Sequence, residues 1–202
     1  REINEDKLPA GIELPKGNQY IKNLVLKKEL NKKWKVSQSS EERLILIKYY
    51  IATWGGIHTN SNESMKEYSS LSASQLIKKG KKGIASWSKA IVVHNPNEYA
   101  IFDARVAISL NCIQKLYNVN NAVLFPVLSS RNKIVALGNK LIKATSKEES
   151  WEKAYEENFY TQYLKILNSV AKELSTDVST IEMLLFAKAE ELVQKTYPNI
   201  LN

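Results

Sequence analysis

The sequence has few of the residues from which disulfide frameworks and most metal centres are built. There is one cysteine, Cys112, which excludes an internal disulfide and any four-cysteine zinc or iron–sulfur site. The only histidines are His58 and His94, too few for a histidine-rich metal centre. We therefore expect no metal and no cofactor. The cysteine usage fits a reducing cytoplasm.

Long apolar runs are also missing. No run reaches the roughly 20 residues needed to span a bilayer, and the N-terminus lacks the basic-then-apolar order of a signal peptide. The sequence begins with Arg1 and not with methionine, so we expect a trimmed chain or a fragment. We expect a cytoplasmic monomer with no membrane partner.

Acidic residues are absent from positions 68–97, and this shapes the charge distribution. That stretch contains five lysines: Lys78, Lys79, Lys81, Lys82 and Lys89. The whole chain carries +8, while residues 147–202 carry −4, so the remainder carries +12. A positive face of this kind favours a polyanion such as nucleic acid, and hence a nucleoid location. The alternative is a solvated lysine-rich surface.

The hydrophobic patterning predicts an all-α protein with a core, since 44% of the residues are apolar and strand signals are weak. Residues 1–18, with two prolines and two glycines, predict an irregular arm. Residues 19–202 are expected to form a single helical domain. Its helices are expected at residues 20–34, 39–54, 64–79, 86–94, 103–117, 131–145, 149–174 and 178–196, with a loop at 118–130.

A lysine-rich hairpin is expected at residues 77–90. Gly80 and Gly83 bracket Lys81 and Lys82 in a tight turn, and a helix of small residues follows. Glycines let a backbone approach a phosphate closely, and a helix N-terminus directs free N–H groups toward it. The residues expected on the DNA backbone are Lys81, Lys82, Gly83, Ala85, Ser86 and Ser88. The alternative is an exposed basic turn.

Asp103 is the candidate functional centre. It lies twenty residues beyond Gly83, after a helix and a turn at Pro96 that return the chain toward the hairpin. A carboxylate there would stabilise the oxocarbenium-like sugar that forms when an N-glycosidic bond breaks, and would orient or activate water. The alternative is an ordinary helix N-cap, and both roles are compatible.

Segments 83–90 (GIASWSKA) and 99–106 (YAIFDARV) resemble the helix-hairpin-helix DNA glycosylase superfamily, in particular its 8-oxoguanine-glycosylase-like bacterial branch. Gly83-Ile84-Ala85 matches the hairpin of that superfamily, with Ala85 in place of the second glycine. Asp103 matches the catalytic aspartate. The resemblance covers residues 77–110. It implies a helical bundle of two small lobes around a central cleft, and activity on double-stranded DNA containing a damaged or modified base.

The lysine nucleophile of bifunctional members has no clear match. Counting from Gly83 puts Trp87 near its position, aligning on Ala90 puts Ser88 there, and Lys89 lies one or two positions away. Either Lys89 is displaced into the role and forms a Schiff base, or the enzyme is monofunctional and uses water. We favour the monofunctional route, with Lys89 otherwise a surface or phosphate-binding residue.

A glycosylase must also extrude its base and hold it. The candidates for this pocket or wedge are Trp54, His58, Asn60 and Trp87. The alternative for the loop 54–60 is a plain helix end with solvent-facing polar residues, and for Trp87 a place in the core. Arg131, in the segment 129–132 that opens a helix, is expected to bind a further phosphate or to belong to an ordinary cap.

Three functions compete on the sequence alone. The first is a DNA glycosylase, acting on damaged bases in repair or on modified phage bases in defence. The second is a helix-hairpin-helix module that binds DNA or a protein without catalysis. The third is a helical interaction domain with an incidental basic face, which leaves the arrangement at residues 77–106 unexplained.

Overall fold

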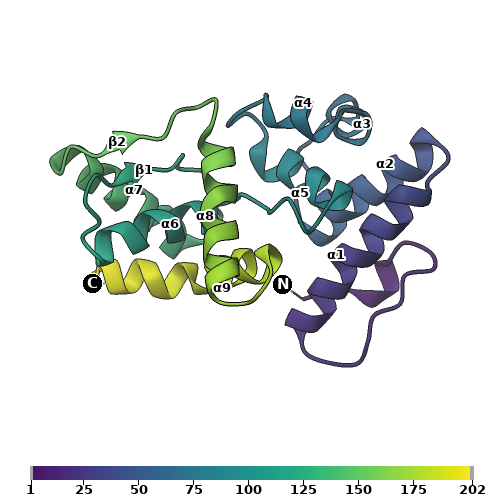
Figure 1. Cartoon of the computed structure of the whole chain (residues 1–202), viewed down its shortest axis with the longest axis horizontal. Coiled ribbons are helices and arrows are strands. Elements are labelled where there is room, and N and C mark those ends of the chain that lie inside the picture. The colour runs from purple at the N-terminus through teal and green to yellow at the C-terminus, as the bar shows by residue number, and fades with distance from the viewer. Residues whose placement is uncertain (1, 201–202) are drawn as a thin grey trace.

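The computed structural model describes residues 2–200. Residues 1, 201 and 202, at the ends of the predicted arm and C-terminal region, lie outside the described residues. The chain forms two groups of helices joined by an extended connection at residues 99–102 (Figure 1). The first group contains η1 (Glu5–Lys7), α1 (Gln19–Val36), α2 (Ser40–Lys48), η2 (Tyr49–Trp54), α3 (Asn62–Ser70), α4 (Ala73–Ile77) and α5 (Ile84–His94). The second contains α6 (Ala104–Leu116), β1 (Val123–Leu124), α7 (Lys133–Glu148), β2 (Glu152–Lys153), α8 (Phe159–Glu173) and α9 (Val178–Thr196).

The expectation of a mostly helical protein is confirmed. The two strands have two residues each and pair in parallel, with Val123 opposite Glu152. None of the helices in the described part of the chain is long and apolar enough to cross a membrane.

Helix α5 is the buried centre of the first group. All its residues except Ala85 and His94 are buried, as expected for a helix surrounded by others. Helix α1 packs against its end, where the Asn31 side-chain amide donates to the carbonyl oxygen of Val93 at 2.9 Å. The arm is irregular apart from η1, and it packs on this core through the buried side chains of Ile3 and Ile12.

Helices α6 and α9 form the centre of the second group. They lie along each other, and the Ser109 hydroxyl on α6 donates to the Leu185 carbonyl on α9 at 2.7 Å. Helix α7 approaches α9 closely at Gly138, where an added Cβ would lie 2.7 Å from the Val193 side chain. A second small core joins α6, α7 and α9; it consists of Ile108, Cys112, Val135, Ile142, Ala189 and Val193.

The connection at residues 99–102 is fixed from both sides. Two buried tyrosines of α8 donate to its carbonyl oxygens, Tyr160 to Ala100 at 2.6 Å and Tyr163 to Ile101 at 2.7 Å. From α5, the Ser88 hydroxyl accepts a hydrogen bond from the Phe102 N–H at 3.1 Å. The residue that follows, Asp103, is therefore placed by both groups of helices.

Two predicted helices have different bounds in the structure. The helix expected at 64–79 is two helices, because Ser72 caps α4 through a reciprocal pair of hydrogen bonds with Gln75 and so ends the preceding segment. The helix expected at 149–174 begins only at Phe159, since the residues before it include β2. Helix α5 begins at Ile84, two residues before the predicted start, because Gly83 takes a left-handed conformation with φ of 70°.

Candidate functional site

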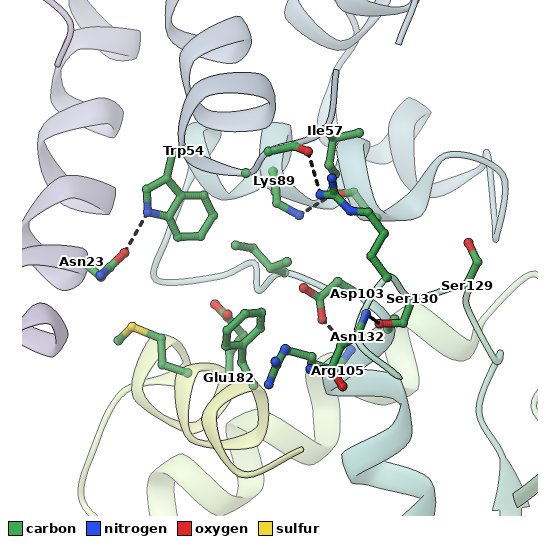
Figure 2. Close-up of a pocket in the computed structure, with 18 of the residues that line it drawn as sticks. Asn23, Trp54, Ile57, Lys89, Asp103, Arg105, Ser129, Ser130, Asn132 and Glu182 are labelled. Atoms are coloured by element: carbon green, nitrogen blue, oxygen red, sulfur yellow. Dashed lines mark hydrogen bonds between the residues drawn. The ribbon is translucent and has the colours of Figure 1, made fainter. Parts of the chain in front are cut away.

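A cavity of about 640 Å³ lies between the two groups of helices (Figure 2). This volume is in the range of roughly 300–1,000 Å³ that suits small-molecule ligands. Its wall contains Asn23, Lys27, Trp54, Gly55, Gly56, Ile57, His58, Thr59, Ala85 and Lys89 from the first group, and Ile101, Asp103, Ala104, Arg105, Ser129, Ser130, Arg131, Asn132, Glu182, Met183 and Phe186 from the connection and the second group.

Asp103 is the N-cap of α6, as the sequence predicts. One carboxylate oxygen accepts hydrogen bonds from the backbone N–H groups of Arg105 at 2.9 Å and Val106 at 3.1 Å. These bonds satisfy two of the N–H groups that have no partner within the first turn of α6. Figure 2 shows this carboxylate directed into the cavity from its lower wall. The capping role is thus confirmed, and the side chain also faces the enclosed space.

Lys89 lies in the opposite wall, so the structure brings it together with Asp103 (Figure 2). Its side chain is buried, and its ammonium group donates to the carbonyl oxygen of Ala85 at 2.6 Å. Successive residues of an α-helix point about 100° apart. Of the three neighbours 87, 88 and 89, only Lys89 lines the cavity, so it is the one placed to act there.

Trp54 reaches the cavity from a π-helical segment, a form that often marks functional sites. Its indole N–H donates to the Asn23 side-chain oxygen at 2.9 Å, and its ring stacks on Tyr50 with ring centroids 4.4 Å apart. The ring is therefore held in one orientation. The next residue, Gly55, lies so close to Lys89 that an added Cβ would be 3.0 Å from the lysine Cε. An added Cβ would also lie 2.3 Å from the Ile51 carbonyl oxygen, so a larger residue at position 55 would disturb the backbone of η2 as well as the Lys89 side chain.

The polar residues of the loop after Trp54 lie in two different surroundings, the cavity and a neighbouring groove. The exposed His58 lies at the rim of the cavity. Asn60 does not line it; its side-chain amide donates to the Ser86 hydroxyl at 2.9 Å, and it faces a neighbouring groove instead. A direct contact of Asn60 with an extruded base is therefore not supported.

Three residues predicted at the DNA surface or in the pocket are buried in the core. Trp87, a candidate wedge, is fully buried, packs edge-on against Tyr160 and donates its indole N–H to the Gly80 carbonyl. Ser88, expected on a phosphate, is fully buried and bonds to Phe102. Ser86 is buried beneath Asn60. The predicted surface positions of Ser86 and Ser88 are wrong, and Trp87 takes its alternative place in the core, because at these positions α5 is covered by other parts of the protein.

The remaining backbone-binding candidates lie at the surface or in the cavity wall. Lys81, Lys82 and Gly83 are exposed on the turn between α4 and α5, and Ala85 lies at the cavity wall. Arg131 is exposed at the cavity, and its guanidinium donates to the Gly56 carbonyl at 3.0 Å. This bond joins the two groups of helices beside the cavity.

Two residues of the cavity wall, Lys27 and Glu182, form an ion pair that was not predicted from the sequence. Both side chains are almost fully buried, with 2% and 4% of their surface exposed. The spacing of polar residues in α1 could have indicated Lys27. Asn23, Lys27 and Asn31 recur every four residues and form a polar stripe on a buried helix face. A signal was also present in α9, where Glu182 interrupts the apolar run 181–186.

Burial has a strong electrostatic effect on Glu182. Loss of solvent raises the pKa of this carboxyl group, and the charge of Asp103 adds to the rise, while Lys27 and Lys89 oppose it. The cavity therefore contains two carboxylates in different environments, with Asp103 hydrogen-bonded to backbone N–H groups and Glu182 enclosed.

The described residues contain no group of three or more histidine, cysteine, aspartate or glutamate side chains suited to a metal ion. Comparison of the chain with family models, with curated proteins and with solved structures gave no match.

Proposed function

We propose that this protein is a DNA glycosylase of the helix-hairpin-helix type, which extrudes a damaged or modified base from double-stranded DNA and cleaves its N-glycosidic bond. The observation that carries the proposal is the Asp103 carboxylate, fixed at a helix N-terminus and directed into a cavity large enough for a base. The resemblance of residues 77–110 to that superfamily supports the same assignment.

Asp103 provides the charge that this reaction needs. As the bond between C1′ and the base nitrogen breaks, its electron pair leaves with the base and the sugar becomes positively charged. A fixed carboxylate stabilises that charge, and removal of one such electrostatic group typically costs about 10²- to 10³-fold in rate. Water then adds to C1′, with Asp103 as the acceptor of its proton.

The turn at Lys81 and Lys82 is proposed to bind the DNA backbone. Each lysine–phosphate interaction releases counterions, so the logarithm of the binding constant falls with the logarithm of salt concentration by about 0.9 per interaction. We expect the variant Lys81→Gln/Lys82→Gln to bind duplex DNA more weakly, with a slope that is lower by about 0.9 for each phosphate that is no longer neutralised. Fluorescence anisotropy in graded salt measures this slope.

The matched control is the variant Lys147→Gln/Lys153→Gln, which removes two lysines from the acidic C-terminal region. An unchanged slope in Lys81→Gln/Lys82→Gln would exclude the turn as a DNA-binding element.

Hydrolysis by water is the proposed route, and Lys89 is not the nucleophile. Its Nζ is held against the start of α5 by a hydrogen bond to the Ala85 carbonyl oxygen, and a nucleophilic lysine must instead be free to reach C1′ of the sugar. We expect that borohydride traps no covalent protein–DNA adduct during base release. An adduct with the wild type that disappears in Lys89→Gln would show instead that Lys89 forms a Schiff base.

The cavity of about 640 Å³ is partly open to solvent, so it has room for a base with a bulky substituent. Bulky bases of this kind occur in phage genomes, and an enzyme that removes them acts in defence instead of repair. The test is a panel of duplexes with oxidised, alkylated, deaminated and bulky bases, in which alkali reveals abasic sites.

A non-catalytic helix-hairpin-helix module is the competing proposal. It explains the basic turn equally well, but it gives no reason for Asp103 and Lys89 to face each other in a cavity. DNA binding without any abasic product across the whole panel would favour this module.

A further inference from the structure

The Lys27–Glu182 ion pair is unusual for its position in the cavity wall. Lys27 comes from α1 and Glu182 from α9, so the pair joins the two groups of helices at the cavity. Glu182 is labelled in Figure 2 below the centre of the cavity, on the same wall as Asp103. Among the ion pairs of the described residues, this one has the least exposed side chains.

A pair of this kind is a poor way to stabilise a fold. The cost of removing two charges from water often exceeds their attraction, and apolar residues of similar size frequently serve as well or better. Buried ionisable groups that line a cavity are instead typical of functional sites, where their proton affinity matters.

The two carboxylates in the cavity differ in the way that acid and base roles require. Asp103 accepts hydrogen bonds from two backbone N–H groups at the start of α6. Glu182 is buried and accepts a hydrogen bond from the adjacent ammonium of Lys27. Two carboxylates whose environments separate their proton affinities commonly divide the work of anion and acid between them.

We propose that the Lys27–Glu182 pair is the general acid of the reaction and donates a proton to the departing base, while Asp103 stabilises the sugar cation. This inference rests on the proposed glycosylase function. The pair holds one transferable proton. As the C1′–N bond breaks, its electron pair leaves with the base and takes up that proton. Water adds to C1′ and gives a proton to Asp103, and exchange with solvent restores both groups, so one water is consumed for each base released.

The charged groups around Glu182 influence how the rate of base release depends on pH. The charged groups that act on it are Lys27 of α1, Lys89 of α5 and Asp103 before α6. Three buried tyrosines also lie near enough to be affected by the charge of Glu182: Tyr50 of η2 and Tyr160 and Tyr163 of α8. Burial raises the pKa of each tyrosine, so they stay neutral. A general acid works in its protonated form. The rate is therefore expected to fall once the pH is high enough to remove the transferable proton from the pair.

The test compares single-turnover base release by the wild type, Glu182→Gln and the double variant Lys27→Met/Glu182→Leu. The substrate is the duplex from the panel that the wild type cleaves. We expect the double variant, which has no transferable proton at this position, to lose about 100-fold or more in rate and to lose the fall in rate at high pH. Glu182→Gln keeps the Lys27 ammonium and is expected to lose less. The loss is expected to be smaller on the same duplex with an electron-withdrawing fluorine on the base, because that base leaves without needing a proton. The control is Lys115→Met/Glu149→Gln, which removes an exposed ion pair remote from the cavity and leaves the rate unchanged.

The outcomes separate this inference from the proposed function. If the wild type releases base, Asp103→Asn does not, and the folded double variant retains the wild-type rate and pH profile, the pair is structural and the inference is overturned. An equal loss on the fluorinated and unmodified substrates also overturns it, because a general acid must respond to the leaving base. If the wild type releases no base from any duplex, the proposed function fails and this inference fails with it.

Discussion

Replacing Asp103 by asparagine is expected to reduce base release by about 100-fold or more and to leave the stability of the protein almost unchanged. Asparagine keeps the side-chain oxygen that caps α6 and is as good an N-cap as aspartate. It removes only the negative charge facing the cavity. Single-turnover base release and thermal unfolding measure the two effects separately.

The alanine variant provides the matching control for the helix cap. Asp103→Ala removes both the charge and the two hydrogen bonds from Arg105 and Val106, so we expect about 1 kcal/mol of destabilisation. Its rate of base release should be as low as that of Asp103→Asn. If Asp103→Asn retained the wild-type rate, Asp103 would be a helix cap alone.

The second large effect is on folding and concerns Lys27. The single variant Lys27→Met leaves the Glu182 carboxylate buried without its ammonium partner, and breaking a buried pair in this way typically costs about 3–5 kcal/mol. The double variant Lys27→Met/Glu182→Leu removes both charges, and we expect it to unfold at a urea concentration equal to or above that of the wild type. Urea denaturation followed by circular dichroism measures both.

The opposite order of stabilities would contradict this account of the pair. If the double variant were as unstable as Lys27→Met, the ion pair itself would stabilise the fold, and a functional reason for its burial would no longer be needed. The single variant should also depend on pH. With the ammonium removed, the pKa of the buried Glu182 rises further, so Lys27→Met should become more stable as pH falls and the carboxyl group is protonated.

Local features of the fold could be predicted from the sequence because short-range chemistry determines them. Asp103 as a helix cap and the glycines of the turn at residues 80–83 depend on neighbouring backbone geometry, which residue type constrains strongly. The break between α3 and α4 was missed although its cap, Ser72 with Gln75, is also local. The pattern of polar and apolar residues over this segment predicted one long helix. The Ser72–Gln75 cap, which marks the start of a second helix, was the better guide to the break.

The orientation of α5 could not be predicted from its own residues. Trp87, Ser88 and Lys89 are consecutive, and a helix that is buried on nearly every side gives no amphipathic pattern to show which of them faces a cavity. The answer depends on packing partners far along the chain, such as Tyr160 against Trp87. For the same reason Ser88 was predicted as a phosphate ligand. In the structure its hydroxyl instead accepts a hydrogen bond from Phe102 and so fixes the connection before Asp103.

The cavity wall is a further long-range property. It combines residues from Asn23 to Phe186, and Lys27 meets Glu182 only because α1 and α9 come together. Charge spacing along a single helix predicts neighbours on that helix, but it does not predict pairs across 155 residues. Asp103 and Lys89, which were predicted from the sequence, line this cavity, whereas the ion pair in its wall was not predicted.

Mass spectrometry of the products from a modified-base duplex tests the central claim most directly. The account predicts that the wild type releases free base and an equal amount of abasic strand, and that Asp103→Asn releases neither while still binding the duplex. DNA of unchanged mass after incubation with wild-type protein that binds it, for every base in the panel, would contradict the assignment of glycosylase activity.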